Sequence, residues 1–333
     1  MNPHFSRRLA IGSALLPLLL AAAACWALLS GSGASAAESL RTILGLPGAD
    51  DGLLLFRIRM PRVAMGIMVG ATLAVCGVMM QGMFRNPLAD PHILGVSSGA
   101  GLGATIAIAL GLGRATLGLG AVTLFAFAGG AGSVALVYLL SRRAGRLSTT
   151  SLLLAGIAVG SLFSAGTTLI MRLNHDKMDH IIFWTMGSLS TVGWKQVFWC
   201  LPFCLIGSLA ALIFARDLNL LSQGEETALH LGVNVGRTRM LIMLLTAIAT
   251  AGAVSATGVI GFVGLIIPHV SRMLFGPDHR RLVPLSALMG AVFMLIMDTL
   301  ARTLAAPLEI PVGILTAMCG GPFFLWLLRR SAL

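Results

Sequence analysis

The sequence MLIMLLTAIATAGAVSATGVIGFVGLIIPHVS, residues 240–271, decides the fold because it contains no Asp, Glu, Lys or Arg over 32 residues. As one α-helix it would be about 48 Å long, whereas the hydrocarbon core of a bilayer is about 30 Å thick. Gly258, Gly261 and Gly264 lie in its second half, where glycine permits the chain to turn. The stretch is apolar enough for a membrane and too long for one straight crossing.

Apolar blocks of this kind recur along the chain. Hydrophobic residues make up 57% and charged residues 11% of the 333, whereas soluble domains carry about 25% charged residues. A spanning helix needs roughly 20 apolar residues, and blocks almost free of charge are residues 9–31, 63–84, 93–113, 115–141, 147–171, 196–215, 240–271, 282–304 and 310–328. The pattern predicts an all-α, polytopic integral membrane protein.

The N-terminus shares features with a secretory signal, namely Arg7 and Arg8, an apolar run and small residues at 35–37. However, the uncharged run at 9–31 is longer than the roughly 7–15 residues of a signal core and long enough to span. We therefore interpret it as an uncleaved first helix.

Basic residues predict the topology, because they concentrate in cytoplasmic loops. The basic clusters expected inside are Arg7–Arg8, Arg142–Arg143–Arg146, Arg216 with Arg237 and Arg239, Arg272 with Arg280–Arg281, and Arg329–Arg330. An even number of crossings must then separate Arg239 from Arg272, so residues 240–271 form two short helices. The prediction is a single transmembrane domain, residues 1–333, with ten spans and both termini in the cytoplasm.

Three arginines contradict this rule locally. Arg57, Arg59 and Arg62 cluster on the predicted outer side, before the second span. A negatively charged external partner would account for them.

The sequence lacks the residues that several classes of function require. The net charge of +11 comes from scattered basic residues without a basic stripe, which argues against nucleic acid as a partner. The only lysines, Lys177 and Lys195, follow no glycine-rich loop, so no P-loop is present and any ATP must bind another subunit. No nucleophile constellation or metal-ligand spacing is visible. We therefore expect a protein that is not an enzyme, with no metal site.

One charged pair falls inside a span. Asp298 and Arg302 are four residues apart and so share a helix face. Charges at this depth are costly and usually face protein or a water-filled cavity. The pair is either a structural ion pair or part of a docking site or substrate path.

The longest polar inner loop is residues 216–239. Ser222 and Glu225 have the spacing of a capping box, and Gly232 is placed to close the helix that follows. We expect a short helix at 223–231 under the membrane, with a solvated connector as the alternative. In the fifth span, Ser161, Ser164 and Thr168 fall on one face and are candidates to line a path.

Several short motifs are distributed along the chain. They are Arg59-Met60-Pro61-Arg62, Gln81, Arg85-Asn86-Pro87-Leu88-Ala89-Asp90-Pro91, Gly95-Val96-Ser97-Ser98-Gly99-Ala100, Gly224-Glu225 with Leu231-Gly232, Gly261-Phe262-Val263-Gly264-Leu265 with Pro268-His269, Asp278-His279-Arg280 and Glu309-Ile310-Pro311-Val312-Gly313. These motifs resemble those of the permeases of ATP-binding-cassette importers for iron-siderophores, haem and cobalamin. They occur in family order between about residues 57 and 329.

The resemblance implies the type II importer permease fold, ten helices working as a homodimer in the bacterial inner membrane, among membrane lipids. Two ATPase subunits, which bind ATP and Mg, would lie on the cytoplasmic side and a periplasmic or extracellular substrate-binding protein on the other. It assigns Arg59, Arg62 and Arg302 to docking of the binding protein, and the segment 218–234, with Ser222, Gly224, Glu225, Ala228, Leu231 and Gly232, to ATPase coupling. Asn86, Leu88, Ser148, Thr149 and Thr150 would form a cytoplasmic gate. The path residues do not come from the resemblance: the fifth span itself makes Ser161, Ser164, Thr168 and Met171 the candidates to line a path.

The leading interpretation is import of a large iron chelate, either haem or a ferric siderophore. A cobalamin importer of the same family is one alternative, and an ion-coupled secondary transporter is another, with Asp298 as its only candidate ion site. The sequence leaves open whether Met171, His175 or His180 contacts substrate, and His92 has no assigned role.

Overall fold

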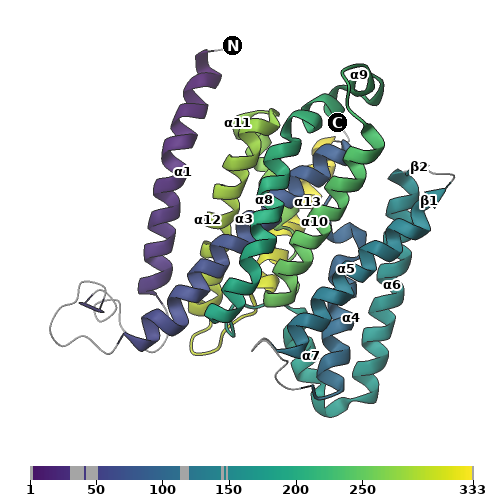
Figure 1. The fold of residues 1–333 in the computed structure, drawn as a ribbon. Helices are drawn as coiled ribbons and strands as arrows, with labels where there is room; N and C mark the ends of the chain where they lie inside the picture. The colour runs from purple at the N-terminus through teal and green to yellow at the C-terminus, as the bar shows by residue number, and fades with distance from the viewer. Residues whose placement is uncertain are drawn as a thin grey trace.

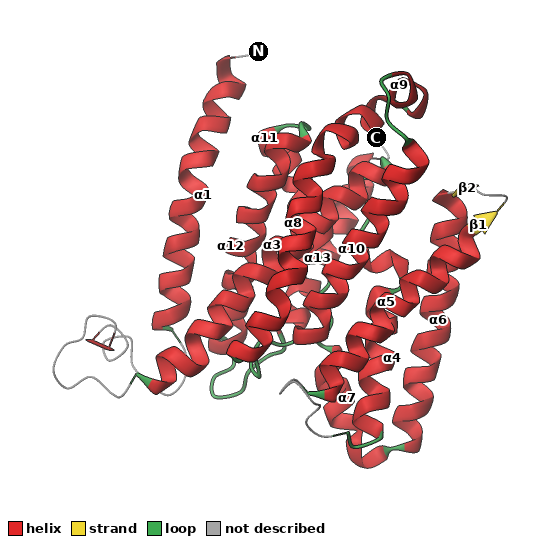
Figure 2. Cartoon of the chain, viewed as in Figure 1, coloured by secondary structure: helices red, strands yellow, loops and turns green. Residues whose placement is uncertain are grey.

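Helices dominate the computed structural model, which describes residues 3–30, 41–42, 52–112, 120–143, 146–147 and 149–331 (Figure 1, Figure 2). The elements are α1 (Pro3–Leu29), the π-helix η1 (Leu55–Arg59), α3 (Met60–Phe84), the 3-10 helix η2 (Pro91–Leu94), α4 (Val96–Ala109), α5 (Ala121–Ser141), β1 (Arg142–Arg143), β2 (Arg146–Leu147), α6 (Thr149–Leu173), the 3-10 helix η3 (His175–Lys177), α7 (Met178–Thr185), α8 (Trp194–Gln223), α9 (Glu225–His230), α10 (Val235–Thr257), α11 (Val263–Phe275), α12 (His279–Thr303) and α13 (Val312–Ser331). The two short strands pair antiparallel, Arg142 with Leu147 and Arg143 with Arg146.

Among the described residues, seven helices are long and apolar enough to cross a membrane. They are α1, η1 together with α3, α5, α6, α8, α10 and α12, while α4, α11 and α13 are shorter apolar helices. Each of the ten coincides with a predicted span. The all-α membrane fold is confirmed, and the total of ten crossings stays a prediction because it depends on the three shorter helices.

The long block at 240–271 is broken where its glycines lie. Helix α10 ends at Thr257, and Gly258 follows with φ +73°, a conformation that favours glycine. A Cβ at Gly258 would lie 2.2 Å from the carbonyl oxygen of Trp184. Phe262, at φ 68°, precedes α11. The predicted division into two helices is confirmed.

Helix limits differ from the charge-free blocks. Helix α8 extends to Gln223 instead of residue 215, and it carries Arg216 and Asp217 within it. Charge marks where a helix leaves lipid, whereas the helix itself continues into water as long as its backbone hydrogen bonds do. Helix α7 was not predicted.

Helix α3 lies at the centre and packs against α8, α10, α11 and α12 (Figure 1). Glycines allow two of these contacts, since a Cβ at Gly70 would lie 2.3 Å from Gly290 O and one at Gly77 1.9 Å from Gly264 O. The start of α1, α9 and the β1–β2 pair lie at one end of the bundle, called the α9 end, and α7 lies at the other, the α7 end (Figure 1). The basic-residue rule predicts that the α9 end is cytoplasmic.

Candidate functional site

A buried ionic cluster joins the beginning of α3 to the end of α12. Arg62 Nε donates to both carboxylate oxygens of Asp298, at 3.0 and 3.1 Å, and Arg62 Nη1 donates to both oxygens of Glu309, at 3.1 and 3.0 Å. Arg302 Nε lies 3.3 Å from Asp298 Oδ2. These four residues are the outer ionic cluster. The predicted pair of Asp298 and Arg302 is confirmed as an ion pair, and Arg62 and Glu309 complete it.

Burial makes this pairing obligatory. The side chains of Asp298, Arg302 and Arg62 are 1%, 5% and 6% exposed, whereas that of Glu309 is 34% exposed. Removing one partner from a buried pair leaves an uncompensated charge, at a cost of several kcal/mol. Glu309 is therefore the one member of the cluster that water reaches readily.

Two arginines also hold the end of α1. Arg59 Nη1 donates to Leu28 O at 2.8 Å, and Arg302 donates to Ala27 O at 3.0 Å and Ser30 O at 3.2 Å. The last carbonyls of a helix lack intrahelical donors and carry partial negative charge, so these arginines cap α1. Arg59, Arg62 and Arg302 thus already have partners within the chain, and residue spacing indicated only the pairing of Arg302 with Asp298. Their role in docking stays a prediction.

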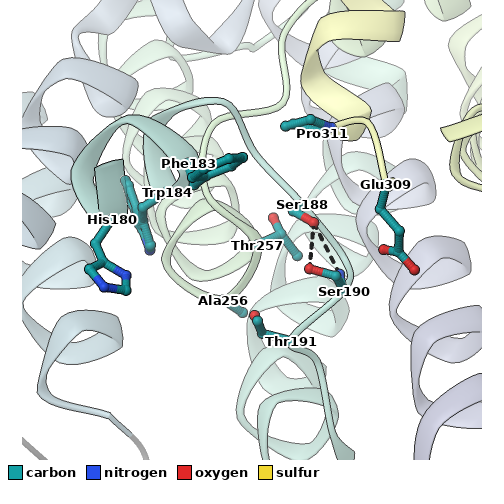
Figure 3. Close-up of a pocket in the computed structure, with 10 residues that line it drawn as sticks. All are labelled: His180, Phe183, Trp184, Ser188, Ser190, Thr191, Ala256, Thr257, Glu309 and Pro311. Atoms are coloured by element: carbon teal, nitrogen blue, oxygen red, sulfur yellow. Dashed lines mark hydrogen bonds between the residues drawn. The ribbon is translucent and has the colours of Figure 1, made fainter. Parts of the chain in front are cut away.

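An outer pocket of about 410 Å³ opens beside the cluster at the α7 end (Figure 3). Ser188 and Ser190 are hydrogen-bonded to each other there, Oγ to Oγ at 2.9 Å and Ser190 N to Ser188 Oγ at 3.1 Å. Glu309 lines the pocket and also holds Arg62, so it links the pocket to the cluster. The lining residues are His180, Phe183, Trp184, Ser188, Ser190, Thr191, Ala256, Thr257, Glu309 and Pro311.

Close backbone packing shapes this pocket. Gly187 has φ +69°, and a Cβ there would lie 2.2 Å from the carbonyl oxygen of Val259. Ser188 N donates to Thr257 O at 2.8 Å, which ties the loop after α7 to the end of α10. The pocket brings in His180 but neither Met171 nor His175, whose Nε2 lies 2.7 Å from Arg172 Nη1.

The turn after α3 carries two of the predicted gate residues. The exposed Asn86 accepts the backbone N–H of the half-buried Leu88 at its Oδ1, at 2.9 Å. Thr149 and Thr150 begin α6 and Thr150 is exposed, while Ser148 lies outside the described residues. The gate stays a prediction.

His92 has a structural role that the sequence did not reveal. Its Nε2 lies 3.0 Å from Ile260 O, in the break between α10 and α11. A carbonyl only accepts, so Nε2 carries the proton and Nδ1 accepts from the Ser97 hydroxyl. His92 therefore ties η2 and α4 to the break.

The predicted path residues lie on an uncovered face of α6. Ser161, Ser164 and Thr168 are exposed and Met171 is half-buried, and Thr168 Oγ1 donates to Ser164 O at 2.9 Å. Large apolar residues share the exposed surface of this helix, among them Leu154, Ile157, Leu162, Leu169 and Leu173. Whether the hydroxyl face lines a path stays a prediction.

The coupling segment forms a short helix, but its predicted capping box is wrong. Ser222 lies in the last turn of α8, where its hydroxyl donates to Asn219 O at 2.6 Å. Gly224, with φ 132°, is the residue directly before α9 and contributes no side-chain cap. Glu225 instead accepts from Arg239 Nη2 of α10, at 2.6 Å. The partner of Glu225 lies 14 residues away on the next helix, outside the four-residue window of a capping box.

Ala228 has the opposite orientation from a docking residue. It is fully buried and packs with Leu221, Val233 and Val235. The expectation that Ala228 faces the ATPase is therefore corrected. At the end of α9, the apolar side chains that are exposed are those of Leu229 and Leu231, with exposed fractions of 58% and 53%.

A second link at the α9 end joins α8 to α12. Asn219 Nδ2 donates to Asp278 Oδ1 at 2.7 Å, and Asp278 caps α12 by accepting from Arg280 N at 3.1 Å. The bond from Asn219 holds the pKa of Asp278 below its usual value, and the nearby Arg280 and Arg281 add to this effect.

Gly232 closes α9 as predicted. It has φ +84°, and the next amide, Val233 N, donates to Ala228 O at 2.9 Å. No heavy atom of the described structure lies within 4 Å of a Cβ at this position. A substitution here therefore acts through backbone strain alone.

We expect Gly232→Val to destabilise the closed end of α9 by about 1–2 kcal/mol, the cost of a left-handed residue with a Cβ. Hydrogen exchange of the amides at 225–233 should accelerate about 5- to 30-fold. Gly232→Asn is the matched control, because Asn tolerates this conformation. Equal exchange in the valine and glycine proteins would show that φ at this position carries no strain.

Comparisons with known proteins agree with this architecture. The FecCD transport family matches residues 18–330. The hemin transport system permease protein HmuU of Yersinia pestis is 41% identical over 339 residues, covering 99% of this chain and 98% of its own. The cobalamin import system permease protein BtuC of Halobacterium salinarum is 46% identical over 272 residues, covering 82% and 72%.

A solved structure gives the same fold. A metal-chelate type ABC transporter in an inward-facing conformation superposes with a TM-score of 0.82 at 39% identity, covering 95% of this chain and 97% of that one. The resemblance drawn from the sequence motifs and the type II importer permease fold are thereby confirmed. The chain belongs to the FecCD transport family and is a permease subunit of an ATP-binding-cassette importer.

Proposed function

We propose that the chain forms a homodimeric pore that imports a large iron chelate, haem or a ferric siderophore, across the bacterial inner membrane. The observation that carries this proposal is the outer pocket, which combines Phe183 and Trp184 with the imidazole of His180 and several hydroxyls. Flat aromatic ligands stack on aromatic rings, and imidazole suits iron. The relative named for hemin matches almost the whole chain.

A substrate-binding protein would deliver the chelate to the α7 end. Arg62 holds Asp298, which is 1% exposed, and Glu309, which is 34% exposed. A carboxylate on the binding protein would replace Glu309 more readily than Asp298, since Glu309 is already partly in water. Docking would then act on a residue that lines the outer pocket.

At the α9 end, two separate ATPase subunits would bind ATP and Mg and contact α9. The exposed Leu229 and Leu231 support this, because exposed apolar residues are typical of protein interfaces. A second copy of the chain would cover the exposed face of α6, so that Ser161, Ser164 and Thr168 face a shared path.

The alternatives have less support. The 46% identity to a cobalamin permease supports a cobalamin importer, but that match covers 82% of the chain, whereas the match to the hemin permease covers 99%. Ion-coupled transport would need Asp298 as a cation site, yet Arg62 and Arg302 both neutralise it. An arginine pair leaves little attraction for a cation.

Uptake into vesicles tests the proposal. The permease, reconstituted with its cognate ATPase and binding protein, should accumulate haem or a ferric siderophore when ATP is supplied, and cyanocobalamin serves as the competing cargo. A vesicle with an ion gradient but no ATPase subunit is the control. Uptake driven by the ion gradient alone would contradict ATP-driven import. Uptake of cyanocobalamin but not of haem or a ferric siderophore would contradict an iron chelate as the cargo.

A further inference from the structure

An apolar groove lies between α5 and α10 near the α9 end, away from the outer pocket. Its volume is about 280 Å³, and the two helices pack side by side along it (Figure 1). The only side-chain hydroxyl in its lining, that of Tyr138, lies 3.3 Å from Met240 Sδ, across the groove. The lining residues are Ala131, Val134, Ala135, Tyr138, Leu139, Met240, Met243, Leu244, Ala247 and Ile248.

Basic residues stand at the end of this groove. The exposed Arg237 lies in the first turn of α10, on the same helix face as Met240 and Leu244, because residues three or four apart align. On the opposite wall, Arg142 and Arg143 follow directly after the last residue of α5. The groove is thus apolar along its length, with Arg237 of α10 at one end and the arginine positions of β1 directly after the end of α5.

We propose that this groove binds an anionic phospholipid, with an acyl chain between α5 and α10 and its phosphate at Arg237. An acyl chain needs no hydrogen-bond partner and matches the apolar lining. Basic positions at the cytoplasmic end of a groove between membrane helices suit anionic head groups. The N-terminus of the 23-residue helix α10, which begins beside Arg237, adds positive potential.

Of the two acidic groups near the start of α10, one is already paired with an arginine. Glu225 is paired with Arg239 at 2.6 Å, and Asp217 Oδ2 lies 3.5 Å from Thr238 Oγ1. Because Arg239 neutralises Glu225, that carboxylate does not offset the charge of Arg237. Lipid bound here would lie beside the ion pair that holds α9 to α10.

Lipid titration of the intact purified permease tests the site. Native mass spectrometry with phosphatidylglycerol and phosphatidylcholine of identical acyl chains should show preferred binding of phosphatidylglycerol. Arg237→Gln should lower the affinity for phosphatidylglycerol about fivefold, which is the effect of one basic residue near a membrane surface. The affinity for phosphatidylcholine should stay unchanged. Ala135→Phe, at an exposed position of the lining, should lower the affinity for both lipids because the phenylalanine side chain would fill the groove.

Matched variants separate the site from general surface effects. Arg216→Gln removes an exposed arginine of α8 at the same end, and Leu140→Phe adds bulk to α5 outside the lining. Both should bind phosphatidylglycerol like the unmodified chain. Equal affinity for the two lipids, an unchanged affinity in Ala135→Phe, or an equal loss in Arg216→Gln would each overturn the proposal.

Discussion

Replacing Asp298 with alanine is expected to lower the free energy of unfolding by about 3–5 kcal/mol. The substitution would leave Arg62 and Arg302, both nearly fully buried, with Glu309 as the remaining carboxylate of the cluster. Arg302 also caps α1 through Ala27 O and Ser30 O. Repulsion between the two guanidinium groups would therefore loosen the contact of α12 with both α1 and α3.

Thermal unfolding of the detergent-solubilised permease measures this loss. Glu309→Gln is the matched control, since it removes the more exposed carboxylate and should cost much less. The double variant Asp298→Asn with Arg62→Gln should recover part of the stability, because it removes charge from both sides of the pair. A melting temperature in Asp298→Ala equal to that of Glu309→Gln would contradict the central role of Asp298.

Sequence spacing predicted only the local half of the outer ionic cluster. Asp298 and Arg302 are four residues apart, so helix geometry alone places them on one face. Arg62 and Asp298 are separated by 236 positions, and their pairing depends on the packing of α3 against α12. Arg62 was singled out for its unexpected outer charge, but its partners could not be derived without the fold.

The positions of the membrane helices could be predicted from the length of the apolar blocks, whereas the residues at which the helices end could not. The break within residues 240–271 was predictable because bilayer thickness limits a straight helix and Gly258 supplies the turn. The extension of α8 to Gln223 was not, since the charges of Arg216 and Asp217 were interpreted as the end of the helix. The orientation of Ala228 was missed for a different reason, because a helix of six residues shows too little periodicity to identify its buried face.

That orientation leaves two exposed leucines on the proposed coupling surface. Leu229 and Leu231 flank the end of α9, while Ala228 anchors the helix to α8 and α10 from inside. Replacing both leucines with aspartate should weaken ATPase binding about a thousandfold, if each contributes roughly 2 kcal/mol as an interface hot spot. The buried side of α9 is untouched, so its fold should persist.

The dissociation constant of the purified permease for its ATPase subunit measures this effect directly. Thr227→Asp, at an exposed and polar position of the same helix, is the matched control and should bind like the unmodified chain. Hydrogen exchange at 225–233 checks that α9 remains formed, since the amide of Val233 should stay bonded to Ala228 O. If the double aspartate variant keeps both its exchange pattern and its affinity, α9 does not contact the ATPase. The ATPase must then contact the permease through another part of the α9 end. The turn with Asn86 and Leu88 is the next candidate, because it directly follows the central helix α3.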